Sequence, residues 1–169
     1  MSSGGEKVPL NILLRVNVGG YDSMTSLSYE HEARHFPFDG ATYYVPCADG
    51  PGRTALWRLI GGGWDHKDSI APGDGWYQTE GAIGCPFTVP HPGTEAITRT
   101  CSATGDHALS PAREGMAGST ELLDVYGYPR YLNRPTSLLQ TTGGGVTVRS
   151  NAVAGAAGNE NPGTQAVSS

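Results

Sequence analysis

The sequence predicts a mainly β protein, with a single β-sandwich or small barrel of short strands, little helix, and extended N- and C-terminal arms. The first observation is that 25 glycines and 12 prolines make up roughly a fifth of the 169 residues, against an average of about 12%. The second is that short runs of β-branched and aromatic residues alternate with these turn-forming residues. The third is that few segments show the spacing of an amphipathic helix. Together they favour strands joined by turns.

Seven short segments are expected to form strands. The first is rich in Leu, Ile and Val and ends at Gly19-Gly20. The segment 95–102 alternates in polarity, as a strand with one apolar face does. Most of the others are bounded by Gly or Pro. The expected strands are residues 10–18, 41–47, 54–60, 75–79, 83–89, 95–102 and 145–149.

Two segments are helix candidates. Residues 119–126 begin at Ser119, which can cap a helix, and carry Glu121 in the first turn; Gly127 and Pro129 would end the helix. Residues 24–35 are the second candidate. The polar stretch 103–118 is expected to be an exposed loop inside the fold.

The chain is expected to divide into an N-terminal arm (1–9), a β-rich domain (10–149) and a C-terminal arm (150–169). The largest apolar side chains of the last segment are Val153 and Val167. Ordering twenty such residues would cost on the order of 20–40 kcal/mol. Recovering that free energy takes roughly 1,000 Å² of buried apolar surface, which is the size of a protein–protein interface. An ordered arm is therefore expected to lie on a neighbouring surface.

Charge and cysteine usage narrow the class of protein. The formal net charge is −5, and only Lys7 and Lys67 are lysines, so no direct nucleic-acid partner is expected. No apolar run is long enough to span a membrane, and no secretory signal is recognised. Synthesis in the cytoplasm is therefore expected. A disulfide between Cys85 and Cys101 is conceivable, but free thiols, Cys47 included, fit a reducing compartment better.

One segment matches a metal-binding pattern. His31-Glu32-Ala33-Arg34-His35 fits H-E-x-x-H and resembles the zincin metalloprotease signature over these five residues. That resemblance implies zinc held by His31 and His35, with Glu32 as the general base. Pro37 would stop the helix where a zincin helix continues, and the pattern does not decide among His66, Glu80 and Asp65 as a third ligand. The competing interpretation is a polar turn with two unrelated histidines.

A second candidate site follows the segment 54–60. Its aromatic residues could stack on a sugar, and the nearby Asp65, Asp68 and Asp74 could bond hydroxyl groups or Ca²⁺. The competing interpretation is that the aromatic residues pack the core and the aspartates build turns. The residues of this candidate carbohydrate site are Trp57, Trp64, Trp76 and Tyr77.

The arms and the absence of a decisive catalytic motif favour a non-enzymatic structural role. We expect an assembly protein, a capsid decoration or coat component of a virion or another particle. Its expected partners are identical subunits or a larger shell or tube protein. No cofactor and no metal is expected. The alternatives are the carbohydrate-binding module and a zinc-dependent hydrolase.

Overall fold

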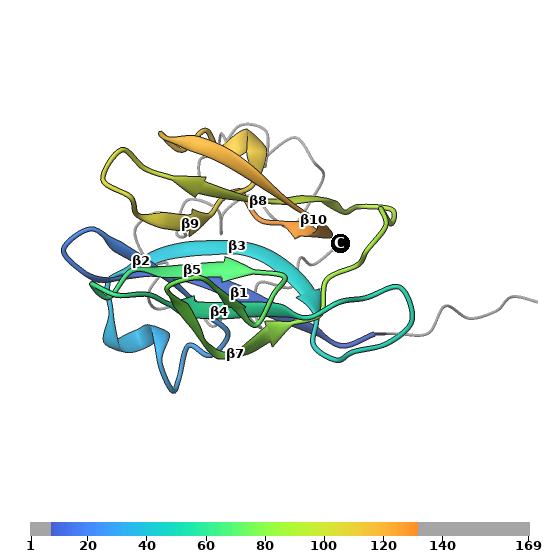
Figure 1. Cartoon of the computed structure of the whole chain (residues 1–169). Coiled ribbons are helices and arrows are strands. Elements are labelled where there is room, and N and C mark those ends of the chain that lie inside the picture. The colour runs from blue at the N-terminus through green and yellow to red at the C-terminus, as the bar shows by residue number, and fades with distance from the viewer. Residues whose placement is uncertain (1–7, 132–169) are drawn as a thin grey trace, which may run out of the picture.

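A computed structural model describes residues 8–131, which form ten strands and two 3-10 turns (Figure 1). The first five strands are β1 (Leu10–Gly19), β2 (Asp22–Ser26), β3 (Phe38–Pro46), β4 (Leu56–Ile60) and β5 (His66–Ser69). The other five are β6 (Gly73–Asp74), β7 (Tyr77–Gly84), β8 (Glu95–Cys101), β9 (His107–Leu109) and β10 (Ser119–Pro129). The 3-10 turns are η1 (Ala33–His35) and η2 (Ala112–Glu114).

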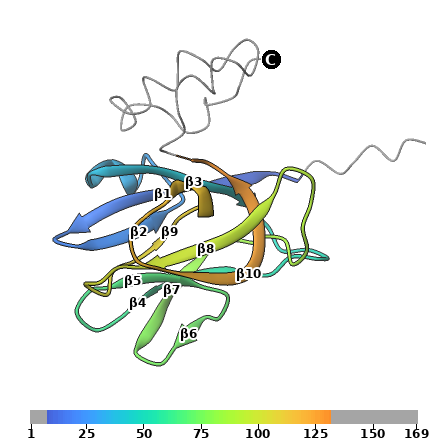
Figure 2. The same cartoon turned by 90° about the horizontal axis from the view of Figure 1, so that it is seen from above.

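The strands form two antiparallel sheets that pack together. The larger sheet has the order β2-β1-β3-β10-β8-β9 and the smaller has the order β5-β4-β7-β6. The long strand β10 joins the two halves of the larger sheet, because it pairs with β8 and, at its end, with β3. Figure 2 shows β10 curving from one half to the other. The edge strands β2, β5 and β9 contact one another, so the sheet edges meet on one side of the molecule.

The main core lies between the two sheets. It contains nine buried residues, and both sheets contribute to it. Adjacent residues of a strand point to opposite faces, so Leu13 enters this core while Leu14 points away from it. Leu14 enters a second cluster with Val16, Met24 and Ala33 of η1. Both faces of β1 are therefore covered, which explains why the consecutive apolar residues Ile12, Leu13 and Leu14 can all be accommodated.

A buried cation ties β1 to the segment after β9. The Arg15 guanidinium donates to Asp39 Oδ2 at 2.8 Å, to Glu114 Oε1 at 2.5 Å and to the Leu109 carbonyl at 2.7 Å. The side chains of Arg15 and Glu114 are almost fully buried. Removing one partner of such a pair leaves an uncompensated buried charge, so the network fixes η2 against β1.

The predicted fold class is confirmed, because the described chain is mainly β with two packed sheets. The predicted strands 10–18, 41–47, 54–60 and 95–102 correspond to β1, β3, β4 and β8, and parts of the predicted strands 75–79 and 83–89 form the single strand β7. The predicted strand 145–149, the arm 150–169 and most of the arm 1–9 lie outside the described residues. The expected loop 103–118 contains β9 and η2.

Both helix predictions are wrong. Residues 119–126 belong to β10, where Leu123 and Val125 are buried while Leu122 and Asp124 are exposed. Alternate burial on the sheet outweighs the capping signal at Ser119. The second segment, 24–35, holds the end of β2 and the 3-10 turn η1 instead of an α-helix. No helix in residues 8–131 is long and apolar enough to cross a membrane.

The three cysteines are free thiols, so Cys85 and Cys101 do not form a disulfide. Cys47 is exposed, Cys101 is half-buried and Cys85 is buried. Burial raises the pKa of the Cys85 thiol, which lowers its reactivity.

The buried carboxyl group of Asp68 predicts a pH dependence of stability. Burial raises its pKa from 3.8 to about 6, against the opposing effects of Thr25 and nearby cationic side chains. The folded state then binds this proton more tightly than the unfolded state. As pH rises from below 3.8 to above 6, Asp68 should lower the free energy of unfolding by about 3 kcal/mol.

Urea unfolding between pH 4 and pH 8 checks this expectation. Asp68→Asn can still accept the hydrogen bond that Thr25 Oγ1 donates, and it should remove this part of the pH dependence. Asp49→Asn, at an exposed position, is the matched control. Parallel pH profiles for the wild type and Asp68→Asn would contradict the expectation.

Candidate functional site

Three β-hairpin turns converge where the sheet edges meet. They join β1 to β2 (residues 19–22), β4 to β5 (residues 61–65) and β8 to β9 (residues 102–106). Each turn ends in an aspartate that is followed by the first or second residue of the next strand: Asp22, Asp65 and Asp106. Glycines with positive φ lie in all three turns, as tight hairpin turns require.

The three aspartates link the hairpins in a closed ring of hydrogen bonds. Asp22 accepts from the His66 backbone N–H at 2.9 Å, and its Oδ2 lies 2.6 Å from His66 Nδ1. Asp65 Oδ2 lies 2.9 Å from His107 Nδ1. Asp106 accepts from the Ser23 backbone N–H at 2.7 Å and from Ser23 Oγ at 2.9 Å. The aspartate of each hairpin thus bonds the residue that follows the aspartate of another hairpin. We call this arrangement the aspartate ring.

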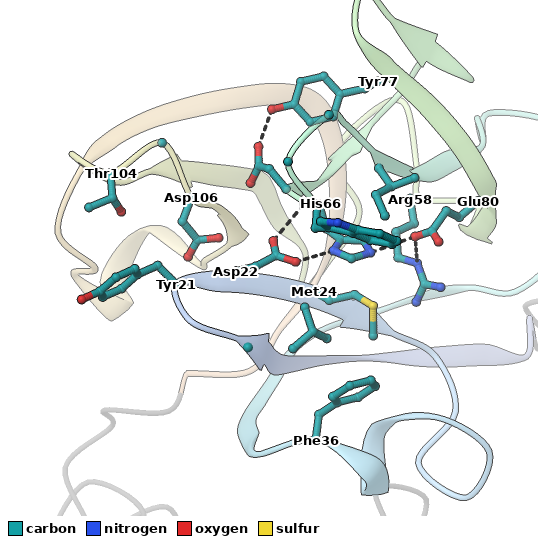
Figure 3. Close-up of a pocket in the computed structure, with 18 of the residues that line it drawn as sticks. Tyr21, Asp22, Met24, Phe36, Arg58, His66, Tyr77, Glu80, Thr104 and Asp106 are labelled. Carbon is teal, nitrogen blue, oxygen red and sulfur yellow. Dashed lines mark hydrogen bonds and ion pairs between the residues drawn. The ribbon is translucent and has the colours of Figure 1, made fainter.

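The aspartate ring lies beside a cavity of about 720 Å³ (Figure 3). This volume is within the range of about 300–1,000 Å³ that is typical of small-molecule sites. The three aspartates line the cavity together with Tyr21 and Trp64. Other lining residues come from β1, β2, β4, β5 and β7, so both sheets build the walls.

The carboxylates are close enough to hold a cation. One oxygen from each of Asp22, Asp65 and Asp106 lies within 4.8 Å of the others. Burial, and then the charges of the other two aspartates, raise the pKa of Asp106. All three carboxylates also accept hydrogen bonds from protein groups. The geometry allows a metal ion, and the hydrogen bonds give each carboxylate a structural role as well.

A second polar group lies at the other end of the cavity, where Figure 3 shows Arg58 and Glu80. The Arg58 guanidinium donates to both oxygens of Glu32, at 2.6 and 3.0 Å, and to Glu80 at 3.1 Å. Hydrogen bonding to Arg58 lowers the pKa of Glu32. His66 lies between Asp22 and Glu80, and its Nε2 is 3.1 Å from Glu80 Oε1. These contacts hold the polar groups of the cavity in fixed positions.

Two aromatic side chains of the cavity are unusually open to solvent. Tyr21 is 80% exposed and Trp64 is 76% exposed, and each directly precedes an aspartate of the ring. Trp64 also has a φ of 68°, in the left-handed region that non-glycine residues rarely adopt. Neither burial nor backbone preference therefore explains a tryptophan at this position.

The structure separates the residues of the predicted carbohydrate site. Trp64 and Tyr77 line the cavity, whereas Trp57 and Trp76 do not. The Tyr77 hydroxyl donates to Asp65, and burial together with this carboxylate raises the pKa of Tyr77. Trp57 lies half-buried on β4, and Trp76 is 89% exposed in the turn between β6 and β7. Asp68 is buried, and Asp74 pairs with Lys67 outside the cavity.

The H-E-x-x-H segment does not form a metal site in the described part of the chain. His31 and His35 are exposed, and η1 is a short 3-10 turn that does not place them on one face of an α-helix. Glu32 pairs with Arg58. The only group of metal-ligating side chains found among residues 8–131 is that of the three ring aspartates.

Tyr21, Asp22 and Asp106 were not among the predicted site residues. A local signal was present in the sequence, because Gly-Gly-aromatic-Asp occurs twice, at 19–22 and 62–65. The pair Asp-His also occurs twice, at 65–66 and 106–107. These short similarities mark corresponding positions in three hairpins, and they have no fixed period along the chain.

Comparisons with family models, curated proteins and solved structures found no match to this chain.

Two substitutions at Asp106 separate hydrogen bonding from charge repulsion in the aspartate ring. Asp106→Ala removes the acceptor of both Ser23 bonds and should cost about 1–3 kcal/mol of stability. Asp106→Asn keeps an acceptor for the Ser23 N–H and removes repulsion with Asp22 and Asp65. It should be at least as stable as the wild type at pH 7.

Chemical denaturation at pH 7 measures the free energy of unfolding of both variants. Asp49→Ala is the control for the loss of an exposed aspartate. Equal stability of the Ala and Asn variants at position 106 would contradict a fastening role for the ring.

Proposed function

We propose that this protein binds a carbohydrate in the cavity beside the aspartate ring. The observation that supports the proposal most is Trp64, a 76% exposed side chain held at a left-handed backbone position on a cavity lined by fixed polar groups. Strained residues persist where the surrounding structure holds them, and they cluster at functional sites. An exposed aromatic ring beside hydrogen-bonding groups suits a ligand with both C–H faces and hydroxyl groups.

The polar groups of the cavity are prepared for hydroxyl recognition. Asp22, Asp65 and Asp106 are fixed by the ring, and Glu80 is fixed by Arg58 and His66. Carboxylates accept several hydrogen bonds each, so oxygen positions remain for ligand hydroxyl groups. Because these side chains are already held by the protein, a ligand need not order them on binding.

The charge of the cavity narrows the class of carbohydrate. Among residues 8–131, five carboxylates line it, from Asp22, Glu32, Asp65, Glu80 and Asp106, whereas Arg58 is the only arginine or lysine in the lining. Like charges brought together oppose binding. We therefore propose neutral or amino sugars as ligands, and we expect sulfated glycans and glycans rich in uronic acids to be rejected.

The matched pair Trp64→Ala and Trp76→Ala tests the proposal. Both tryptophans are highly exposed, but only Trp64 lines the cavity. Stacking of a nucleic-acid base on an aromatic side chain is worth about 1–3 kcal/mol. By analogy, Trp64→Ala should weaken binding roughly tenfold or more, while Trp76→Ala should leave binding unchanged. Calorimetric titration with a panel of soluble neutral, amino and acidic oligosaccharides measures the effect.

Two results would overturn the proposal. One is the absence of binding by every neutral and amino sugar in the panel. The other is binding that survives Trp64→Ala and is lost in Trp76→Ala, because the ligand would then contact the turn between β6 and β7 instead of the cavity.

The role in assembly remains a second proposal, supported by the sequence of residues 150–169, which lie outside the described part of the chain. A component of a virion or another particle could carry a carbohydrate site, so the two proposals are compatible.

Light scattering of the full chain beside residues 1–149 tests the role of the arm in assembly. An oligomer that dissociates on truncation supports that role. The same number of subunits per particle in both samples would contradict it. A zinc-dependent hydrolase is not proposed, because His31 and His35 do not form a metal group with Glu32.

A further inference from the structure

A second hollow adjoins the cavity beside the aspartate ring. It has a volume of about 320 Å³ and lies between the segment after β2 and the strand β7. Its lining includes Leu27 and His31 from the first of these and Ala82 from the second. Both hollows share Glu32, Arg58 and Glu80 in their linings, so they meet at this group of ion pairs.

The shared group is a bridge of polar side chains. Arg58 is the most buried of the three, with 14% of its side chain exposed, whereas Glu32 and Glu80 are 34% and 29% exposed. Arg58 also donates to the Thr25 carbonyl at 3.0 Å. The guanidinium is therefore held by protein groups, and the side chains of the two glutamates are partly exposed at the junction. A ligand that extends from one hollow to the other would meet hydrogen-bond acceptors there.

The groups follow one another in a line. Figure 3 shows Tyr21, Thr104 and Asp106 at one end of the larger cavity and Arg58 and Glu80 at the other. Because the second hollow shares Arg58 and Glu80, it continues from that far end. Tyr21 and Asp106 thus lie at one end of the path, Arg58 and Glu80 lie between the two hollows, and the second hollow lies beyond them.

The second hollow has the features of a further subsite. Leu27 is 44% exposed and offers apolar surface, and Ser28 and His31 offer polar atoms. A Cβ built on Gly81 would meet nothing within 4 Å, so the space beside β7 is open. The volume of this hollow is at the lower end of the range of about 300–1,000 Å³ for small-molecule sites.

We propose that the ligand is a chain of linked sugar units that runs from the larger cavity, which Trp64 lines, across Glu32, Arg58 and Glu80, to the hollow beside Leu27 and His31. The proposal rests on the proposed function and adds the length and direction of the ligand. It also gives the exposed His31 a place in a binding surface. A single sugar could occupy the larger cavity alone, whereas a longer chain would use the apolar and polar groups of both hollows.

A length series tests the proposal, with uncharged β-1,4-linked glucose oligomers and their N-acetylglucosamine counterparts, from dimer to hexamer, as probes. Affinity should rise about tenfold or more along the series that binds. The variant Ala82→Trp places a large side chain at an exposed position of the second hollow. It should remove the gain with length while leaving dimer binding unchanged. Ala117→Trp, at an exposed alanine that lines neither hollow, is its control.

A second pair of variants tests the apolar contact. Leu27→Ala should weaken the hexamer several-fold and leave the dimer unaffected. Leu122→Ala removes an exposed leucine that lines neither hollow and should change neither affinity. This pair avoids the added bulk of tryptophan, so it remains informative if Ala82→Trp folds poorly.

The outcomes separate this inference from the proposed function. The chain-like ligand would be overturned if dimer and hexamer bound with equal affinity and neither Ala82→Trp nor Leu27→Ala changed that affinity. If Trp64→Ala still weakened binding, the carbohydrate site would stay in place. Absence of binding by every oligomer would overturn both. A length-dependent affinity that Ala82→Trp abolishes and Ala117→Trp does not would support the path across Arg58.

Discussion

The aspartate ring is the interaction on which the arrangement of this molecule depends most. The edge strands β2, β5 and β9 contact one another but do not pair as neighbours in either sheet. Unpaired strand edges leave backbone groups without partners. Asp22 and Asp106 satisfy two of these groups, the backbone N–H of His66 and of Ser23. The carboxylates therefore supply, between hairpins, hydrogen bonds that a β ladder would otherwise supply.

The same ring produces the candidate site. Placing an aspartate at the end of each turn brings three negative charges together, which opposes folding unless hydrogen bonds compensate. It also places the residues just before two of the aspartates, Tyr21 and Trp64, beside the cavity. The cavity therefore lies where the hydrogen bonds of the ring join the three hairpins. The two Gly-Gly-aromatic-Asp sequences, at 19–22 and 62–65, supply aromatic and acidic side chains to its lining. Arg15 supports this geometry by binding the Leu109 carbonyl at the end of β9 and Glu114 in the segment that follows.

The sequence predicted the fold class because composition and strand patterns are local properties. The Leu-, Ile- and Val-rich sequence of β1 and the alternation of β8 were sufficient to identify those strands. The segment 119–126 was predicted incorrectly, because its capping residues favour a helix while its burial on the sheet depends on β8, which is distant in the sequence. Short polar strands such as β5, whose residues are His66, Lys67, Asp68 and Ser69, carry no apolar pattern at all. Their place depends on tertiary contacts.

The site was predictable only in part. Trp64 and Tyr77 were identified as aromatic candidates, but Trp57 and Trp76 belong to other surfaces. Asp22 and Asp106 are far from Asp65 in the sequence, and only the meeting of the sheet edges brings them together. The H-E-x-x-H pattern requires an α-helix, and the turn at η1 does not provide one.

Mapping the bound ligand by nuclear magnetic resonance tests the proposed carbohydrate site most directly. Backbone and indole N–H signals would be followed during titration with the tightest-binding neutral oligosaccharide. We expect the largest shifts at the Trp64 indole and in the turns 19–22, 61–65 and 102–106, with the Trp76 indole unchanged. Shifts centred on Trp76, or spread over the outer face of β10 away from the aspartate ring, would contradict the account.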